Sequence, residues 1–64
     1  MIHFCVDDLR HSSRWWYGSP EAVFAEVERI AGEAEAIEAA SWAELAAVGD
    51  TCFGTDFEIE VMAL

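Results

Sequence analysis

The stretch SPEAVFAEVERIAG, residues 19–32, decides the fold predicted for this chain, because it marks both ends of a helix. Ser19 can accept a hydrogen bond from a free backbone N–H, and Pro20 gives up only a donor that would have no partner at the first helical position. Gly32 is typical of the residue that ends a helix. Between these ends the apolar residues recur at helical spacing on one face, and they are Val23, Phe24, Val27, Ile30 and Ala31.

Two strands are predicted outward from this helix, one near each end of the sequence. Residues 2–6 alternate between branched or aromatic side chains and other residues, which indicates a half-buried strand that ends at Asp7-Asp8. Residues 57–61 show the same alternation, with Phe57, Ile59 and Val61 on the apolar side. Residues 8–18 are predicted to be a loop, in which 15–17 can be extended.

Residues 33–40, EAEAIEAA, fit two structures. Ala and Glu favour a helix, so the first helix can run past its glycine. We favour a short strand over 34–39, because Ser41 and Glu44 have the spacing of a capping box that would start a separate helix.

This second helix is predicted to run through Val48 and to end at Gly49, with Trp42, Leu45 and Val48 packed on the rest of the protein because a helix this short is not stable alone. The predicted order is strand, helix, an optional strand, helix, strand. We therefore expect a single α+β domain over residues 1–64, in which two helices cover one face of a two- or three-stranded, mainly antiparallel sheet.

Carboxylates dominate the charged residues. The chain has 13 Asp and Glu against 3 Arg and no Lys, and its formal net charge is −10. Eleven of these carboxylates lie in residues 21–64, where Arg29 is the one base. A hydrophobic fraction of 55% argues against a disordered acidic tail. A folded, acidic body suits a basic partner, and the commonest basic surfaces are those that hold nucleic acid, whereas nucleic acid itself would be repelled.

The carboxylates predicted to contact this partner lie at regular spacing. Same-side carboxylates on the final strand are about 7 Å apart, while each strand of a duplex carries one phosphate per about 3.4 Å of axis. Such rows could occupy a groove of Arg and Lys as phosphates do, although alternating acids also serve as the solvated face of a strand. The candidates are Asp56, Glu58 and Glu60 on the strand, with Glu21, Glu26, Glu28, Glu33, Glu35 and Glu38 in the helical region.

The aromatic residues Trp15 and Trp16 permit two interpretations. We expect at least one of them to fill the small core, while the nearby arginines neutralise carboxylates. As an alternative, both can anchor a protein partner, because Trp, Tyr and Arg are enriched at interface hot spots.

Catalysis, cofactors and metals are not expected. No phosphate-binding loop or nucleophile motif occurs. His3 and Cys5 share one side of the first strand, but no third orienting group is evident. Cys5 and Cys52 are expected to be free thiols, since a disulfide is disfavoured in a reducing compartment. No apolar run is long enough to span a bilayer, so we expect a cytoplasmic protein without a membrane partner.

In its size, its lysine-free composition and the acidic rows Glu21/Glu26/Glu28 and Asp56/Glu58/Glu60, the chain resembles the small acidic anti-CRISPR proteins of bacteriophages that mimic DNA. The resemblance is one of overall character and rests on no motif. It implies docking on the basic DNA-binding surface of a CRISPR surveillance complex in the bacterial host, which would block target DNA. The alternative is an antitoxin, immunity-type or regulatory module that binds one basic protein without mimicking DNA. The oligomeric state stays open.

Overall fold

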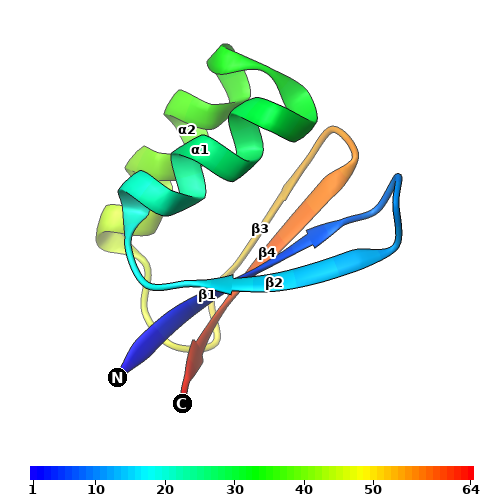
Figure 1. The fold of residues 1–64 in the computed structure, drawn as a ribbon. Helices are drawn as coiled ribbons and strands as arrows, with labels where there is room; N and C mark the ends of the chain where they lie inside the picture. Colours follow the sequence, from blue (N-terminus) through cyan, green and yellow to red (C-terminus); the bar gives the residue numbers. More distant parts are fainter.

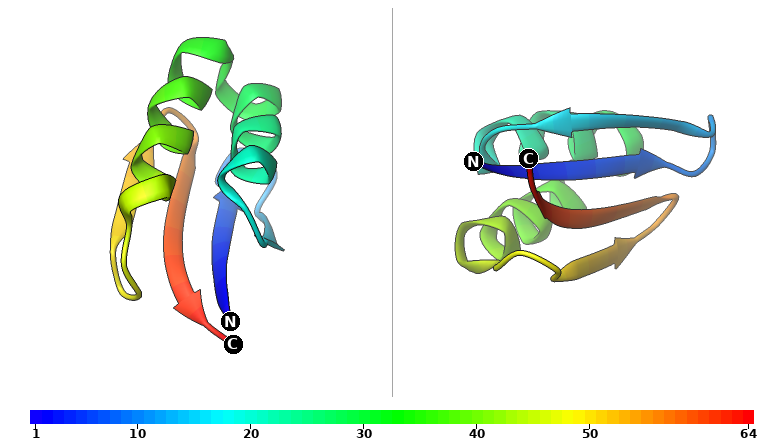
Figure 2. Two further views of the ribbon diagram at one scale, coloured as in Figure 1. Left: turned by 90° about the vertical axis from the view of Figure 1, so that its left-hand side faces the viewer. Right: turned by 90° about the horizontal axis from the view of Figure 1, so that it is seen from below.

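Four antiparallel strands and two helices form two layers in the computed structural model, which describes all 64 residues (Figure 1). The elements are β1 (Ile2–Asp8), β2 (Ser13–Tyr17), α1 (Pro20–Ala31), α2 (Glu33–Leu45), β3 (Thr51–Gly54) and β4 (Phe57–Ala63). The strand order is β2-β1-β4-β3, so the first and last strands of the chain lie side by side at the centre of the sheet. Both helices cover one face, and the other face has no covering layer (Figure 2). The predicted α+β two-layer domain is confirmed.

Helix α1 forms as its sequence predicts. The Ser19 hydroxyl oxygen accepts a hydrogen bond from the backbone N–H of Ala22 at 3.2 Å, and Pro20 is the first helical residue. Val23 and Val27 are completely buried against the sheet. The apolar face therefore attaches α1 to the core, and Glu21 and Glu28 are left exposed.

Gly32 ends α1 and is the only residue between the two helices. Its backbone has φ +94° and ψ 173°, its N–H donates to the carbonyl of Glu28 at 3.0 Å, and its carbonyl accepts from the N–H of Ala36 at 3.1 Å. The residue thus closes one helix and opens the next. This backbone conformation is essentially restricted to glycine.

Replacing Gly32 with alanine is expected to lower the free energy of unfolding by about 1–3 kcal/mol. A Cβ at this position would meet no atom within 4 Å, so the whole cost would come from the backbone conformation. Gly18→Ala is the control, because Gly18 is equally open but has no positive φ; its effect should stay within about 0.5 kcal/mol. Equal midpoints for the two variants in urea unfolding would contradict the prediction.

The prediction of a strand over 34–39 is wrong, because α2 is one continuous helix from Glu33 to Leu45. Ala36, Ala39 and Ala43 are buried, and these small side chains allow α2 to pack closely against α1 and the sheet. Packing along this stripe stabilises the helix through Ser41, so the capping-box pattern does not mark a start.

The end of α2 also differs from the prediction. The helix stops at Leu45, whose side chain is 90% exposed, and Val48 is exposed in the loop that follows. Trp42 does pack against the core as expected. Gly49, with φ +95°, lies in the turn before β3.

The sheet has four strands, whereas two or three were predicted. The difference is two short edge strands. Ser13–Tyr17, placed in a loop from the sequence, pairs with β1, which itself continues through Asp8. Thr51–Gly54 pairs with β4. The observed order is therefore β-β-α-α-β-β, with a hairpin before and after the pair of helices.

The core lies between the sheet and the helices. It is formed by apolar side chains of the two central strands together with the inner faces of α1 and α2. Burial of one such side chain contributes about 1.5–3 kcal/mol. The buried strand residues are Phe4, Val6, Phe57, Ile59 and Val61.

The ring of Phe57 covers Gly54, its partner across the β3–β4 hairpin. A Cβ built at Gly54 would overlap two carbon atoms of that ring. The absence of a side chain on β3 at this position is therefore what allows Phe57 to reach the core.

Candidate protein-binding surface

All three arginines are bound to carboxylates of this chain. The Arg10 Nη2 atom lies 2.7 Å from Oδ2 of Asp56. Arg14 forms a two-pronged pair with Asp7, at 2.6 Å from Nε to Oδ1 and 3.0 Å from Nη2 to Oδ2. The expectation that arginines neutralise nearby carboxylates is confirmed for these two.

Arg29 joins α1 to a buried carboxylate at the end of β1. Its guanidinium donates to Glu26 at 2.8 and 2.9 Å and to Oδ2 of Asp8 at 3.1 Å. Asp8 is 2% exposed, and its carboxylate also accepts from the backbone N–H groups of Arg10 and His11 and contacts the His11 Nδ1 atom at 2.9 Å. These bonds hold the β1–β2 turn against α1.

The pKa of the Asp8 carboxyl is lowered to about 2, chiefly by its hydrogen bond with His11 and also by the bond with Arg29. The pKa of Glu26 is lowered as well, mainly by Arg29. In both cases the folded protein favours the ionised form of the carboxyl group over the protonated form, so both groups stabilise the fold at neutral pH.

Acidification is expected to remove this stabilisation. A carboxylate with a depressed pKa stabilises the fold above its unfolded pKa of about 4 and loses that contribution as the pH falls through the folded value. The difference in free energy of unfolding between the wild type and Asp8→Asn should therefore be largest above pH 4. It should shrink as the pH falls to about 2, which is the pKa of Asp8 in the folded protein. Urea unfolding across this range measures it. The exposed Glu21→Gln is the control, and a pH-independent difference for Asp8→Asn would contradict the assignment.

Nine of the thirteen carboxylates have no cationic partner in the folded chain. Because every arginine is already paired, the surface presents no free cation of Lys or Arg type to balance them. The nine are Glu21, Glu28, Glu33, Glu35, Glu38, Glu44, Asp50, Glu58 and Glu60.

Eight of these nine carboxylates divide between two sides of the molecule. The ninth, Asp50, lies just before β3 and accepts a hydrogen bond from the backbone N–H of Ala47 at 2.8 Å. Six belong to α1 and α2, and we call them the helix-layer carboxylates: Glu21, Glu28, Glu33, Glu35, Glu38 and Glu44. Glu58 and Glu60 form a second group on β4, which we call the sheet-face carboxylates. They point away from the helices, because the alternate residues of β4 are buried beneath them. The structure thus does not join the predicted strand and helix rows into one surface.

Two of the predicted site residues, Asp56 and Glu26, are not free surface carboxylates, because each is paired with an arginine. Asp56 lies in the β3–β4 turn with φ +64°, outside the strand, and its carboxylate is bound to Arg10. The row of three acids on the final strand is therefore a pair. Glu26 is paired with Arg29 and its side chain is only 12% exposed.

The other predicted carboxylates of the helices have no cationic partner, as expected, and all but one are exposed. Glu21, Glu28, Glu33 and Glu38 are exposed on the helices. Glu35 is half-buried, and its Oε1 atom accepts a hydrogen bond from the backbone N–H of Thr55 at 2.7 Å. Glu35 therefore also holds the β3–β4 turn in place.

Neither Trp15 nor Trp16 fills the core, which corrects the prediction that at least one would. They are 66% and 52% exposed on the edge strand β2, and as neighbours on a strand they face opposite sides of the sheet. Trp16 lies beside Cys5 on the uncovered face. Phe53 is 71% exposed on the other edge strand, opposite Glu58.

The cysteines are free thiols. Burial is the main cause that raises the pKa of Cys5 and of Cys52, so few thiolates form at neutral pH. No hydrogen bond joins Cys5 to His3, whose Nδ1 atom is buried without a partner. No three His, Cys, Asp or Glu side chains converge in the arrangement of a metal site. Neither helix has the length and apolar character that crossing a bilayer requires.

The cluster of Asp8, His11 and Arg29 was missed from the sequence. Asp8 at the end of the predicted strand, with Arg10 and His11 two and three positions later, is a recognisable turn signal, because an Asp side chain often accepts from backbone N–H groups at that spacing. The contact with Arg29, 21 positions away, gives no such local signal. No family model matches the chain, and no curated protein or solved structure is similar enough to count as a match.

Proposed function

We propose that this protein inhibits a basic nucleic-acid-binding protein by occupying its nucleic-acid site, and that the target is the DNA-binding surface of a CRISPR surveillance complex. The observation that carries the proposal is the internal pairing of every arginine, which leaves nine carboxylates without a cationic partner on a folded scaffold. A basic groove would supply the missing cations.

The electrostatic step of this mechanism is attraction at a distance. Charge of one sign on a compact body speeds encounter with an oppositely charged site. Several carboxylates lie where the backbone favours them, since Glu21 is in the first turn of α1 and Glu33 and Glu35 are in the first turn of α2. The charges are therefore carried by ordered helices, and binding does not have to pay for ordering a flexible chain.

A second candidate is an antitoxin-like or immunity-type module that recognises one basic protein by its shape. The exposed aromatic residues Trp15, Trp16 and Phe53 favour it, because such side chains anchor protein interfaces. The separation of the carboxylates onto two sides also differs from a single row of phosphates. Competition with duplex DNA separates the two candidates, since only a DNA mimic must exclude DNA from its binding site.

The experiment uses a purified surveillance complex loaded with its guide RNA and a fluorescent target duplex. Adding the protein first, at low salt and in molar excess, should prevent the duplex from binding. Two variants identify the responsible side: Glu33→Lys/Glu38→Lys alters the helix-layer carboxylates, and Glu58→Lys/Glu60→Lys alters the sheet-face carboxylates by the same total charge.

The two variants provide matched controls for each other. Loss of inhibition in one of them assigns the binding side, and circular dichroism checks that both remain folded. Unimpeded DNA binding with the wild-type protein would overturn inhibition of that complex. Full inhibition by both variants would show that these carboxylates do not make the contact.

A further inference from the structure

We propose that the groove between the start of α1 and the end of α2 is a binding site for one arginine side chain of a basic protein partner. The groove has a volume of about 260 Å³ and lies on the outer side of the helix pair. Its lining residues are Pro20, Glu21, Phe24, Ala40 and Glu44. The inference deepens the proposed function, on which it rests, by naming the group that the acidic surface recognises.

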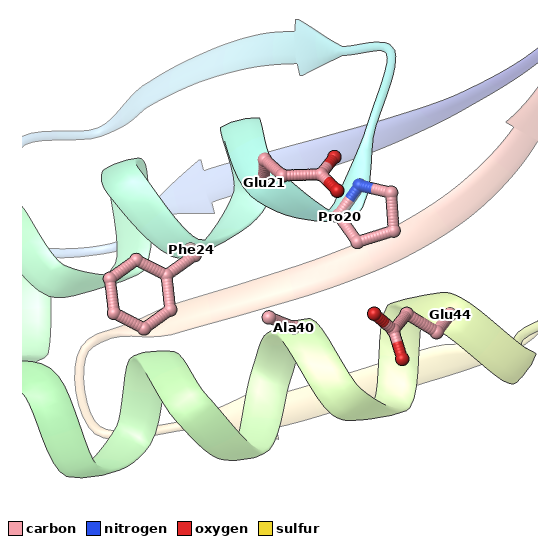
Figure 3. A pocket seen from close by; sticks show the side chains of 5 residues that line it. All are labelled: Pro20, Glu21, Phe24, Ala40 and Glu44. Carbon is pink, nitrogen blue, oxygen red and sulfur yellow. The ribbon is translucent and has the colours of Figure 1, made fainter.

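The apolar part of the groove suits the aliphatic stem of arginine. The ring of Phe24 extends from α1 into the space between the helices, and Ala40 faces it from α2 (Figure 3). Pro20 adds apolar surface at the other end. Arginine commonly buries its methylene groups along such a surface while its charged head stays near polar groups.

Two carboxylates flank the Pro20 end of this groove. Glu21 comes from α1 and Glu44 from α2, and the Glu44 carboxylate points from its helix towards the space beside Pro20 (Figure 3). Neither residue has an ion-pair partner in the chain. One planar guanidinium can donate to two carboxylates at once, which a compact ammonium group does less well.

The position of Glu44 gives a second reason for a cation here. It lies in the last turn of α2, where no basic residue is present, and the unpaired carbonyl groups of a helix end already favour positive charge. A carboxylate adds to that negative potential. A guanidinium beside Glu44 would satisfy the side chain and the helix end together.

The test is an NMR titration of the ¹⁵N-labelled protein with the peptide acetyl-Gly-Arg-Gly-amide. We expect chemical-shift changes concentrated at residues 21–25 and 40–45. The same peptide with citrulline, a neutral group of nearly the same shape, should bind at least about tenfold more weakly, because it lacks the charge that strengthens the hydrogen bonds. Equal binding of both peptides, or changes spread over the whole surface, would overturn the proposal.

A matched pair of variants separates this groove from general electrostatic attraction. Glu21→Gln/Glu44→Gln removes the two groove carboxylates, and it should weaken the arginine peptide about tenfold. Glu28→Gln/Glu33→Gln removes one carboxylate from each helix at the opposite end of the helix pair, with the same change in net charge, and should have little effect. Equal weakening by both would contradict a specific site.

The groove and the proposed function can fail separately. Peptide binding without inhibition of the surveillance complex would overturn the target but retain the arginine site. Inhibition by the wild-type protein that Glu21→Gln/Glu44→Gln leaves unchanged would overturn the role of the groove in the complex.

Discussion

Replacing Phe57 with alanine is expected to lower the free energy of unfolding by about 3–5 kcal/mol, because a buried aromatic ring is lost and a cavity remains. Phe57 is 2% exposed at the centre of the core. A domain of this size rarely has more than about 3–5 kcal/mol of stability from its core. The variant should therefore be largely unfolded at 25 °C, which urea unfolding and near-ultraviolet circular dichroism would show.

Phe53→Ala is the matched control, because it removes the same side chain from the other strand of the same hairpin. Phe53 is 71% exposed, so its loss should change the stability by no more than about 0.5 kcal/mol. Similar stability losses in the two variants would contradict the assignment of Phe57 to the core and Phe53 to the surface.

The same prediction extends to Gly54, which the Phe57 ring covers. Gly54→Ala should cost about 1–3 kcal/mol, because the added methyl group overpacks the site. In a Phe57→Leu background the ring is absent, so the alanine should cost less. An unchanged cost in that background would show that the ring is not what excludes a side chain.

Association with the proposed surveillance complex is expected to slow by about 10–10³-fold when NaCl is raised from about 50 mM to about 500 mM. The nine unpaired carboxylates would produce this attraction, and salt screens it. The dissociation rate should change much less, because close contacts determine it. Biolayer interferometry with the immobilised complex gives both rates, and a salt-independent association rate would contradict an electrostatic mechanism.

The two adjacent tryptophans can report which side of the molecule binds. Trp15 lies on the same side of the sheet as the helices, and Trp16 lies on the uncovered face with Glu58 and Glu60. An anchor of this type is worth at least about 2 kcal/mol, which corresponds to dissociation about 30-fold faster after truncation to alanine. Only one of Trp15→Ala and Trp16→Ala should dissociate faster by this factor. It should be the variant that lies on the same side of the sheet as the charge-reversal variant that loses inhibition.

The elements that the sequence predicts well are those with local signals. Ser19, Pro20 and Gly32 define α1 because capping and backbone restrictions act within a few residues. The final strand follows from strict alternation. By contrast, α2 carries alanines and apolar residues around its whole circumference, so no face was evident, and Ser41 and Glu44 imitate a helix start inside a continuous helix.

The parts that were missed depend on contacts between distant residues. The edge strands β2 and β3 are mostly exposed, so burial imposes little pattern on them, and they form because their neighbours β1 and β4 offer backbone partners. The pairing of Arg10 with Asp56 spans 46 positions. For the candidate site, composition indicated an excess of carboxylates, but only the fold shows which of them are free and that they face two sides.

The position of β1 and β4 at the centre of the sheet affects how the chain reaches its native state. These strands come from opposite ends of the sequence, and the backbone N–H of Leu64 donates to the carbonyl of Met1 at 3.0 Å. The α1–α2 pair can form early from contacts close in sequence, but the two hairpins cannot share a sheet until the ends of the chain meet. Contacts of such long sequence separation slow folding. On the ribosome, the core can close only after β4 has been synthesised and has emerged, because β4 supplies Phe57, Ile59 and Val61 to the core and is the central partner of β1.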